Sequence, residues 1–97
     1  MVKLALLARL EAKPGREKEV ADFIKSALPL AQQENDTINW YALQLGPSTF
    51  GIFDTFEHEE GRNAHLGGQI AQALMTKAPE LLASAPVIEK VDLIAVK

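Results

Sequence analysis

Two segments, one near each end of the chain, have apolar side chains on both sides of an extended backbone. Residues 2–11 and 87–96 are rich in Leu, Val, Ile and Ala and do not alternate cleanly between apolar and polar residues. A strand with one solvated face should alternate, so these segments predict a sheet that is covered on both faces. Helices can cover one face. We expect the other face to pack against a second copy of the chain as a homodimer.

The size of this predicted interface favours an obligate dimer. Burial of about 600 Å² per chain, at about 25 cal/mol per Å², would contribute roughly 15 kcal/mol before the costs of ordering.

The predicted elements follow the order βαββαβ. Four β-prone runs and two stretches with helical spacing are separated by turn residues: 2–11, 17–34, 37–45, 49–57, 59–74 and 87–96. Pro29 predicts a break in the first helix near residues 25–28, and Gly67-Gly68 predicts an interruption or close packing in the second. Pro79 predicts a further short helical turn through Leu82.

With right-handed crossovers, this order gives an α+β, ferredoxin-like unit. It consists of a four-stranded antiparallel sheet with both helices on one face, formed as a single domain over residues 1–97.

Composition and charge exclude several classes of protein. The 97 residues include no cysteine, which excludes disulfides and thiolate chemistry. Ten Lys and Arg against 13 Asp and Glu give a net charge of -3 without a basic cluster, which argues against nucleic acid as a partner. The apolar stretch at residues 4–8 is too short for a membrane span or a secretory segment, so we expect a soluble, cytoplasmic protein with no membrane partner. No motif for binding a phosphate, a metal or another cofactor is present, and we expect none to be bound.

His65 is the strongest candidate for chemistry. It lies on the flank of the apolar stripe of the second helix, where a half-buried imidazole with a pKa near 6.5 could accept a proton from a phenol at neutral pH. The alternative is a structural histidine bonded to a backbone carbonyl. Asp54 interrupts an apolar run, and it could orient His65, bond Tyr41 or serve as a plain cross-strand partner.

Two neighbouring aromatic residues must point in different directions. Trp40 and Tyr41 are consecutive on a strand, so their side chains lie on opposite faces, and Asn39 shares the face of Tyr41. One of the two aromatics therefore packs in the core or at the dimer face. His58 lies among acidic residues and has no second ligand at a suitable spacing, which predicts a solvated turn instead of a metal site.

The residues together form a pattern that runs over nearly the whole chain. It contains a strand, Lys13-Pro14-Gly15, an amphipathic helix, a turn at Glu34, an aromatic strand, Asp54-x-Phe56 and Ala64-His65-Leu66. This pattern resembles the antibiotic biosynthesis monooxygenase family. Members of that family have a ferredoxin-like fold that dimerises through its sheets into an α/β barrel, and the resemblance implies the same here.

Individual positions carry this resemblance. Trp40 stands where the family usually has Tyr, Asp54 where it often has Glu, and Phe56 where Trp or Tyr is common, while His65 matches the histidine of the second helix. The family's Glu-Pro-Gly turn is Glu34-Asn35-Asp36 here. The related haem-degrading branch needs an Asn on the first strand and a Trp near Phe56, and this chain has neither, which argues against haem degradation.

The resemblance implies a monooxygenase that oxidises a quinol, a polycyclic phenol or an anthrone with O₂ and needs no cofactor. His65 would be the general base, assisted by Asp54, and Asn39 or Tyr41 would donate to the developing oxyanion. Trp40 and Phe56 would stack on a planar ring. Arg62 and Gln69 lie three residues before and four residues after His65, and they complete the predicted substrate site.

Two other functions stay open from the sequence. One is a non-catalytic dimeric barrel that binds a small hydrophobic ligand. The other is an isomerase or decarboxylase that uses His65 as a proton shuttle without O₂.

Overall fold

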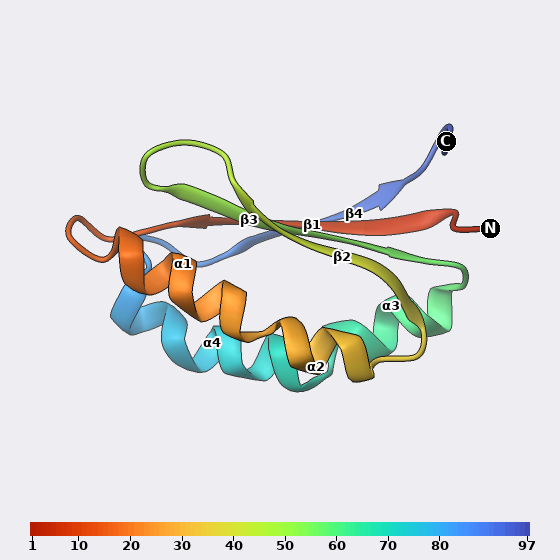
Figure 1. Ribbon diagram of the computed structural model, residues 1–97, viewed down its shortest axis with the longest axis horizontal. Helices are drawn as coiled ribbons and strands as arrows, with labels where there is room; N and C mark the ends of the chain where they lie inside the picture. The colour runs from red at the N-terminus through yellow and green to blue at the C-terminus, as the bar shows by residue number, and fades with distance from the viewer.

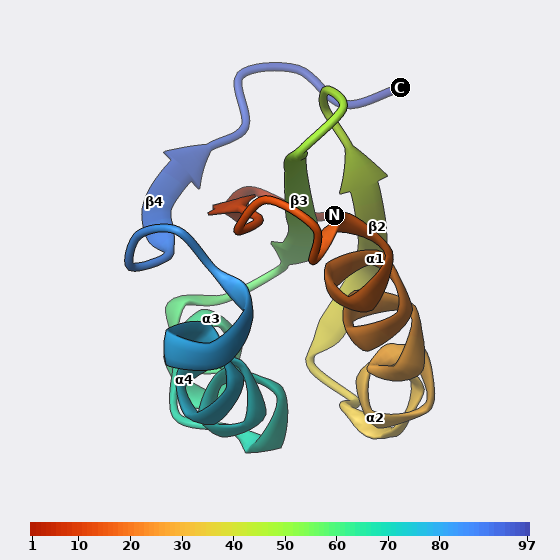
Figure 2. The ribbon, with the colours of Figure 1, turned by 90° about the vertical axis from the view of Figure 1, so that its left-hand side faces the viewer.

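The computed structural model describes residues 1–97 and has eight elements in the order β1–α1–α2–β2–β3–α3–α4–β4 (Figure 1). The strands are β1 (Leu4–Glu11), β2 (Thr37–Gln44), β3 (Thr49–Phe56) and β4 (Val87–Asp92). The helices are α1 (Glu17–Ser26), α2 (Leu28–Gln33), α3 (Glu59–Leu66) and α4 (Gln69–Leu81). All the helices lie beneath one face of the sheet (Figures 1 and 2). The opposite face, on whose side the C-terminal segment runs, carries no helix and is called the bare face.

The four strands form one antiparallel sheet in the order β2-β3-β1-β4. This order confirms the predicted α+β, ferredoxin-like class. Residues directly opposite each other in a sheet share a face. The pairs Leu10↔Phe50 and Ala8↔Ile52 join β1 to β3, and Trp40↔Asp54 joins β2 to β3. All of these residues lie on the helix side, because Leu10, Ala8, Phe50 and Ile52 belong to the core beneath the sheet.

The core lies between the sheet and the helices. Its main cluster joins inward residues of β1 and β3 to α1, α4 and the residue after α4: Ala8, Leu10, Ala12, Val20, Ile24, Phe50, Ile52, Leu74, Ala78, Leu81 and Leu82. A smaller cluster contains Ala27, Ala31 and Ile70, and Trp40 packs against both clusters. Trp40 therefore lies between the two clusters. No helix combines the length and the apolar character that a membrane span requires.

Both predicted helix interruptions are confirmed. The first helical stretch breaks at Ala27, so that Pro29 occupies the first turn of α2, where its missing N–H removes no hydrogen bond. Gly67 and Gly68 separate α3 from α4. A Cβ on Gly68 would lie 3.3 Å from the carbonyl oxygens of Ala64 and His65, so a larger residue would crowd the end of α3.

Two predicted boundaries are wrong. Pro79 lies inside α4 and does not begin a new turn, and β4 ends at Asp92 instead of Val96. Asp92 pairs with Leu4, the first residue of β1, and Leu93 adds only one backbone hydrogen bond, to Lys3 at 2.9 Å. The last strand therefore stops because its only neighbour in the sheet stops.

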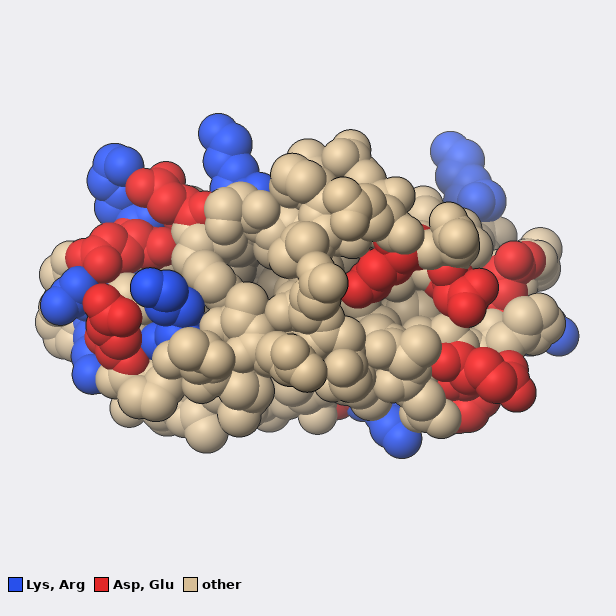
Figure 3. Space-filling view, turned by 90° about the horizontal axis from the view of Figure 1, so that it is seen from below, with Lys and Arg blue, Asp and Glu red and all other residues tan.

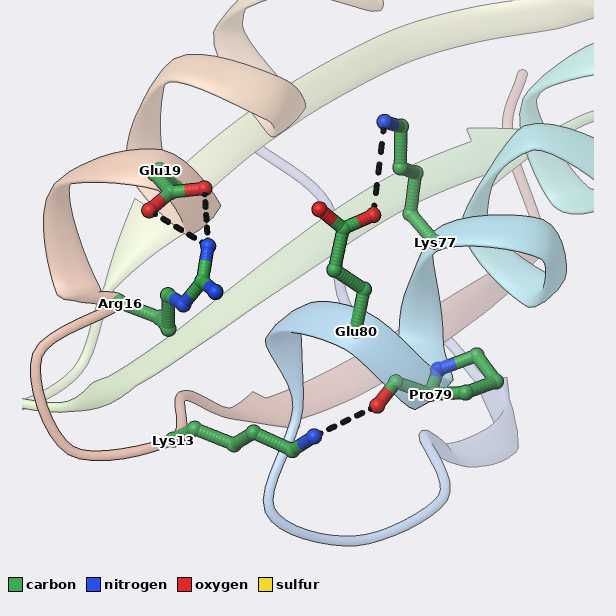
Figure 4. A network of polar contacts seen from close by, with 6 residues as sticks. All are labelled: Lys13, Arg16, Glu19, Lys77, Pro79 and Glu80. Carbon is green, nitrogen blue, oxygen red and sulfur yellow. Dashed lines mark hydrogen bonds and ion pairs between the residues drawn. The ribbon is translucent and has the colours of Figure 1, made fainter.

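At the end of the molecule that holds the β1–α1 turn, a polar network joins that turn to α4 (Figure 4). Gly15 lies in this turn at φ 85°, a left-handed conformation that glycine adopts without strain. The Lys13 Nζ donates to the carbonyl oxygen of Pro79 at 2.6 Å. Two exposed ion pairs flank this contact and contribute little to stability: Arg16–Glu19 and Lys77–Glu80.

A buried guanidinium group fastens α3 to the sheet. The Arg62 Nη1 donates to the carbonyl oxygens of Ala5 in β1 and Val91 in β4, both at 3.3 Å. Its Nη2 pairs with Glu59 at 2.9 Å, and the Arg62 side chain is only 7% exposed. Arg62 therefore holds the short edge strand β4 as well as α3.

Arg62→Ala should lower the free energy of unfolding by about 2–3 kcal/mol, because the bonds from a charged donor and the packing of its stem are lost together. Urea denaturation measures this change. Arg16→Ala is the control, and we expect it to change stability by less than about 0.5 kcal/mol because its ion pair is exposed. Equal effects of the two substitutions would contradict the anchoring role of Arg62.

Candidate active site

The imidazole of His65 lies between two carboxylates. Its Nδ1 is 2.6 Å from Oε1 of Glu34, and its Nε2 is 2.7 Å from Oδ2 of Asp54. The side chains of His65 and Asp54 are 9% and 2% exposed, whereas that of Glu34 is 23% exposed. His65 comes from the last turn of α3, Asp54 from β3, and Glu34 from the C-terminal end of α2. Three separate elements therefore build this cluster.

The two carboxylates hold the ring in different ways. Glu34 makes a hydrogen bond with Nδ1, and the Thr37 hydroxyl also donates to the same carboxylate oxygen at 2.8 Å. The contact between Asp54 and Nε2 is short, but neither oxygen of Asp54 has a hydrogen bond of good geometry. This contact is therefore an ion pair. We infer that the neutral ring keeps its proton on Nδ1, facing Glu34, and has its lone pair on Nε2.

The surroundings of His65 keep the ring charged. Burial lowers the pKa of His65, but the adjacent carboxylates of Asp54, and then of Glu34, together outweigh burial and raise the pKa from 6.5 to about 9. The value near 6.5 expected from the sequence is wrong because it left out both carboxylates. The ring is an imidazolium at neutral pH, and its partners are carboxylates instead of a backbone carbonyl.

The structure has two sizeable cavities near this region, and only the first is lined by residues of the cluster. One, of about 370 Å³, is largely polar, and His65, Glu34 and Gln69 are among its lining residues. The other, of about 460 Å³, is largely apolar and lies between α1 and the sheet, with Ile24, Trp40 and Phe50 in its wall. Figure 3 shows the helix side of the molecule, where acidic side chains adjoin a hollow surrounded by uncharged residues.

Trp40 connects the apolar cavity to the charged cluster. It lines that cavity, and it is the direct cross-strand partner of Asp54. Tyr41 also lines this cavity, but only Trp40 packs against the core and pairs with the inward-facing Asp54, so Trp40 is the aromatic that faces the interior. Phe56 also lies beside the cluster, with its ring centroid 5.6 Å from that of His65.

Other predicted site residues lie elsewhere. Asn39 and Tyr41 are on the bare face of the sheet, where Asn39 accepts a hydrogen bond from Thr55 at 2.8 Å and Tyr41 stacks on Phe53 at 6.4 Å. Tyr41 also lines the apolar cavity. Within one chain, these two residues are separated from His65 by the sheet. Arg62 is bound to backbone carbonyls and lines neither cavity described here. The structure thus gathers His65, Asp54, Trp40, Phe56 and Gln69 on one side of the sheet.

Glu34 is the member of the cluster that sequence reasoning missed. The resemblance marked it only as the start of a turn, and 31 residues separate it from His65. The one available signal was an acidic residue at the end of an amphipathic helix.

The structure offers no metal site at His58 or in the cluster. His58 is exposed, and no group of three His, Asp or Glu side chains is placed to hold a metal ion. The two carboxylates meet different nitrogens of His65, so the three groups have no common point for an ion.

Comparisons with solved structures identify the family of folds to which this chain belongs. No family model and no curated protein sequence matches the chain. A solved structure of a proposed antibiotic biosynthesis monooxygenase from Nitrosomonas europaea has a TM-score of 0.82 at 10% identity, over 95% of this chain and 90% of that one. Another, from Caulobacter crescentus, has a TM-score of 0.72 at 21% identity, over 97% and 92%. The chain thus has the fold of the antibiotic biosynthesis monooxygenases, as the resemblance predicted.

A third structure is similar in sequence as well. The NE2512 protein of Nitrosomonas europaea, whose function is unknown, is 63% identical over 100% of this chain and 94% of its own length, with a TM-score of 0.97. The chain belongs to the same family as NE2512.

The charged cluster predicts a pH dependence of stability. The pKa of His65 is raised in the folded state, so its contribution is complete below pH 6.5 and is lost as the pH rises through about 9. A gap of this size corresponds to roughly 3 kcal/mol. Urea denaturation should show this loss between pH 6.5 and pH 9.5 in the native protein, and His65→Gln should abolish it. His58→Gln should leave it intact. A native protein of constant stability over this range would contradict the charged cluster.

Proposed function

We propose that this protein is a monooxygenase that oxidises a quinol, a polycyclic phenol or an anthrone with O₂ and uses neither a metal nor a flavin. One observation carries the proposal: a buried histidine lies between two carboxylates, and one of these, Asp54, is the cross-strand partner of Trp40, which lines an apolar cavity. The likeness in fold to proposed monooxygenases supports the same class of reaction.

The apolar cavity suits a planar ring. Its volume of about 460 Å³ lies in the range of small-molecule sites, and most of its wall is hydrophobic. Trp40 and Phe50 offer aromatic surface on which a bicyclic or tricyclic ring can stack. A substrate seated there would direct its hydroxyl past Trp40 towards Asp54 and His65.

His65 is suited to removing a phenolic proton. A base with a pKa of about 9 is well matched to a phenol with a pKa of about 10, so the transfer is nearly balanced in energy. The proton reaches His65 through Asp54, because the hydroxyl donates to this carboxylate. The Oδ2 of Asp54 lies 2.7 Å from Nε2, the nitrogen left free because the hydrogen bond to Glu34 keeps the other proton on Nδ1. Glu34 acts as a positioning residue, and because it is partly exposed in the polar cavity it gives the proton a route to solvent.

The anion that remains is the species that reacts with O₂. An electron-rich hydroquinone anion gives one electron to triplet O₂, and the resulting radical pair recombines with formation of a C–O bond. Loss of water by cleavage of the O–O bond completes the reaction, so that a hydroquinone and O₂ give a hydroxyquinone and water. The substrate supplies both electrons that reduce the second oxygen atom, and no external reductant is needed.

Oxygen uptake with a panel of hydroquinones and anthrones tests this function. We expect His65→Ala to lower the rate by about 10²–10⁴-fold because the base is removed. His58→Ala is the matched control and should retain the native rate. Since only about 1% of His65 is neutral at pH 7, the native rate should rise with pH to a plateau above about pH 9.

Other outcomes point to other functions. An unchanged rate in His65→Ala would remove the histidine from the mechanism, and a rate that falls above pH 7 would rule it out as the base. Turnover of a substrate under nitrogen would indicate an isomerase or decarboxylase, and binding with no turnover would indicate a binding protein.

We also propose that the protein is a homodimer whose bare sheet faces meet. On that face, Leu7 and Tyr41 both pair with Phe53, and Leu43 lies on the same side. Tyr41 is 51% exposed in the single chain, and the other three are only partly buried. An apolar surface of this extent supports a second copy of the sheet as its cover. The predicted location of the protein is the cytoplasm.

Phe53→Glu should convert the dimer to a monomer at micromolar concentration, because the substitution puts a charge at the centre of the apolar face. Sedimentation equilibrium measures the mass in solution. Met75→Glu is the control, since Met75 is an exposed apolar residue of α4 on the helix side, and it should leave the dimer intact. A native protein that sediments as a monomer would contradict the interface.

A further inference from the structure

Four buried side-chain atoms have no hydrogen-bond partner in the protein: the indole Nε1 of Trp40, both carboxylate oxygens of Asp54, and Nε of Arg62. Of the two Asp54 oxygens, Oδ2 is in ion-pair contact with His65, which leaves Oδ1 without a polar contact. Trp40 and Asp54 are direct cross-strand partners in β2 and β3, so their side chains leave neighbouring points of the sheet on its helix side. Buried polar groups are nearly always paired, and an unpaired donor and an unpaired acceptor on cross-strand partners indicate a binding point for a further group.

The chemistry of the two atoms restricts what that group can be. An indole N–H can only donate a hydrogen bond, and an ionised carboxylate can only accept one. Asp54 is in ion-pair contact with His65 through Oδ2, at 2.7 Å. A group that satisfies both atoms must accept from Trp40 and donate to Asp54. A hydroxyl does both, whereas a ketone or quinone oxygen has no proton to give and a carboxylate is repelled.

We infer that Trp40 and Asp54 together bind the hydroxyl of a planar aromatic ligand, and so select the reduced, phenolic form of a compound over its ether or its quinone. This inference rests on the proposed function for the class of ligand, and it adds the atoms that recognise it. The ring of the ligand lies in the apolar cavity of about 460 Å³, of which Trp40 is one wall. Both polar atoms are closed to solvent, so the Trp40 side chain must shift to admit the hydroxyl.

The same arrangement favours release of the oxidised product. Oxidation of the hydroxyl to a carbonyl removes the proton that Asp54 accepts, and the carbonyl oxygen then faces a carboxylate. A site built around a hydroxyl discriminates strongly against analogues that lack it, because its own buried groups become unpaired. We expect a phenol to bind at least about 30-fold more tightly than the corresponding methyl ether.

The chain offers a direct reporter for this inference. Trp40 is its only tryptophan, so the indole N–H gives a single ¹H–¹⁵N resonance. We would titrate the full-length protein under nitrogen with 2-naphthol and with 2-methoxynaphthalene. Naphthol should move the indole resonance to a saturating end point, and the ether should bind at least about 30-fold more weakly.

Two variants separate the binding point from general effects. Asp54→Asn has an amide group that can donate to the ether oxygen, so the preference for naphthol should fall to about threefold or less. Asp92→Asn, at an exposed position in β4, is the matched control and should keep the native preference. If Asp54→Asn does not fold, the titration of the native protein still tests the inference, because it compares the naphthol with the ether and uses no variant.

Several results would overturn the inference. These are equal binding of the naphthol and the ether, naphthol binding that leaves the indole resonance in place, an unchanged preference in folded Asp54→Asn, or no naphthol binding up to its solubility limit. Oxygen uptake is a separate measurement. Lost preference with intact turnover rejects the hydroxyl site alone, and intact preference without turnover rejects the proposed oxidation alone.

Discussion

The site depends on the fact that all the helices cover the same face of the sheet. This arrangement makes one interior, between sheet and helices, and every second residue of β3 points into it. Phe50, Ile52 and Phe56 fill that interior with apolar surface, and Asp54 places a carboxylate among them. A charge in such a place is costly unless it is paired, so the position of Asp54 requires a cation nearby. His65 is that cation.

The position of His65 explains several features of the chain around it. α3 ends at Leu66, one residue after this histidine, where Gly67 and Gly68 follow, and α2 ends directly before Glu34. The two helix interruptions thus place a base and a carboxylate at the ends of their helices, from which they reach each other across the gap between the helix pairs. Removing either carboxylate would leave the remaining charges in the interior poorly compensated, so chemistry and stability are coupled in this cluster.

The neighbouring residues Trp40 and Tyr41 have their side chains on opposite faces of the sheet, and a different role is proposed for each face. Trp40 faces the interior, where it pairs with Asp54, whereas Tyr41 stacks on Phe53 on the bare face of the sheet, and both residues line the apolar cavity. Catalysis is proposed for the interior face and association for the bare face. The fold itself hosts many functions, and the closely similar NE2512 protein has none assigned, so the proposed activity rests on the cluster and its cavity.

Much of the fold could be read from the chain because its signals are local. Helical spacing, Pro29 and the pair Gly67-Gly68 act within a few residues, and the structure has helices and breaks where they predict them. The end of β4 could not be read in this way, because it depends on where β1 begins. Asp54 and His65 were both recognisable as unusual residues for their positions. Their contact, and above all the role of Glu34, is formed only when α2, α3 and β3 are packed together.

The sequence alone therefore determined the elements, their order and the residue types available for chemistry, since these follow from periodicity and turn residues within short stretches. Only the tertiary structure decided that His65 carries a charge at neutral pH, because its pKa depends on two carboxylates brought to it from distant parts of the chain. The tertiary structure also decided which aromatic faces the interior, since the face of a strand acquires a meaning only when helices cover one side of the sheet.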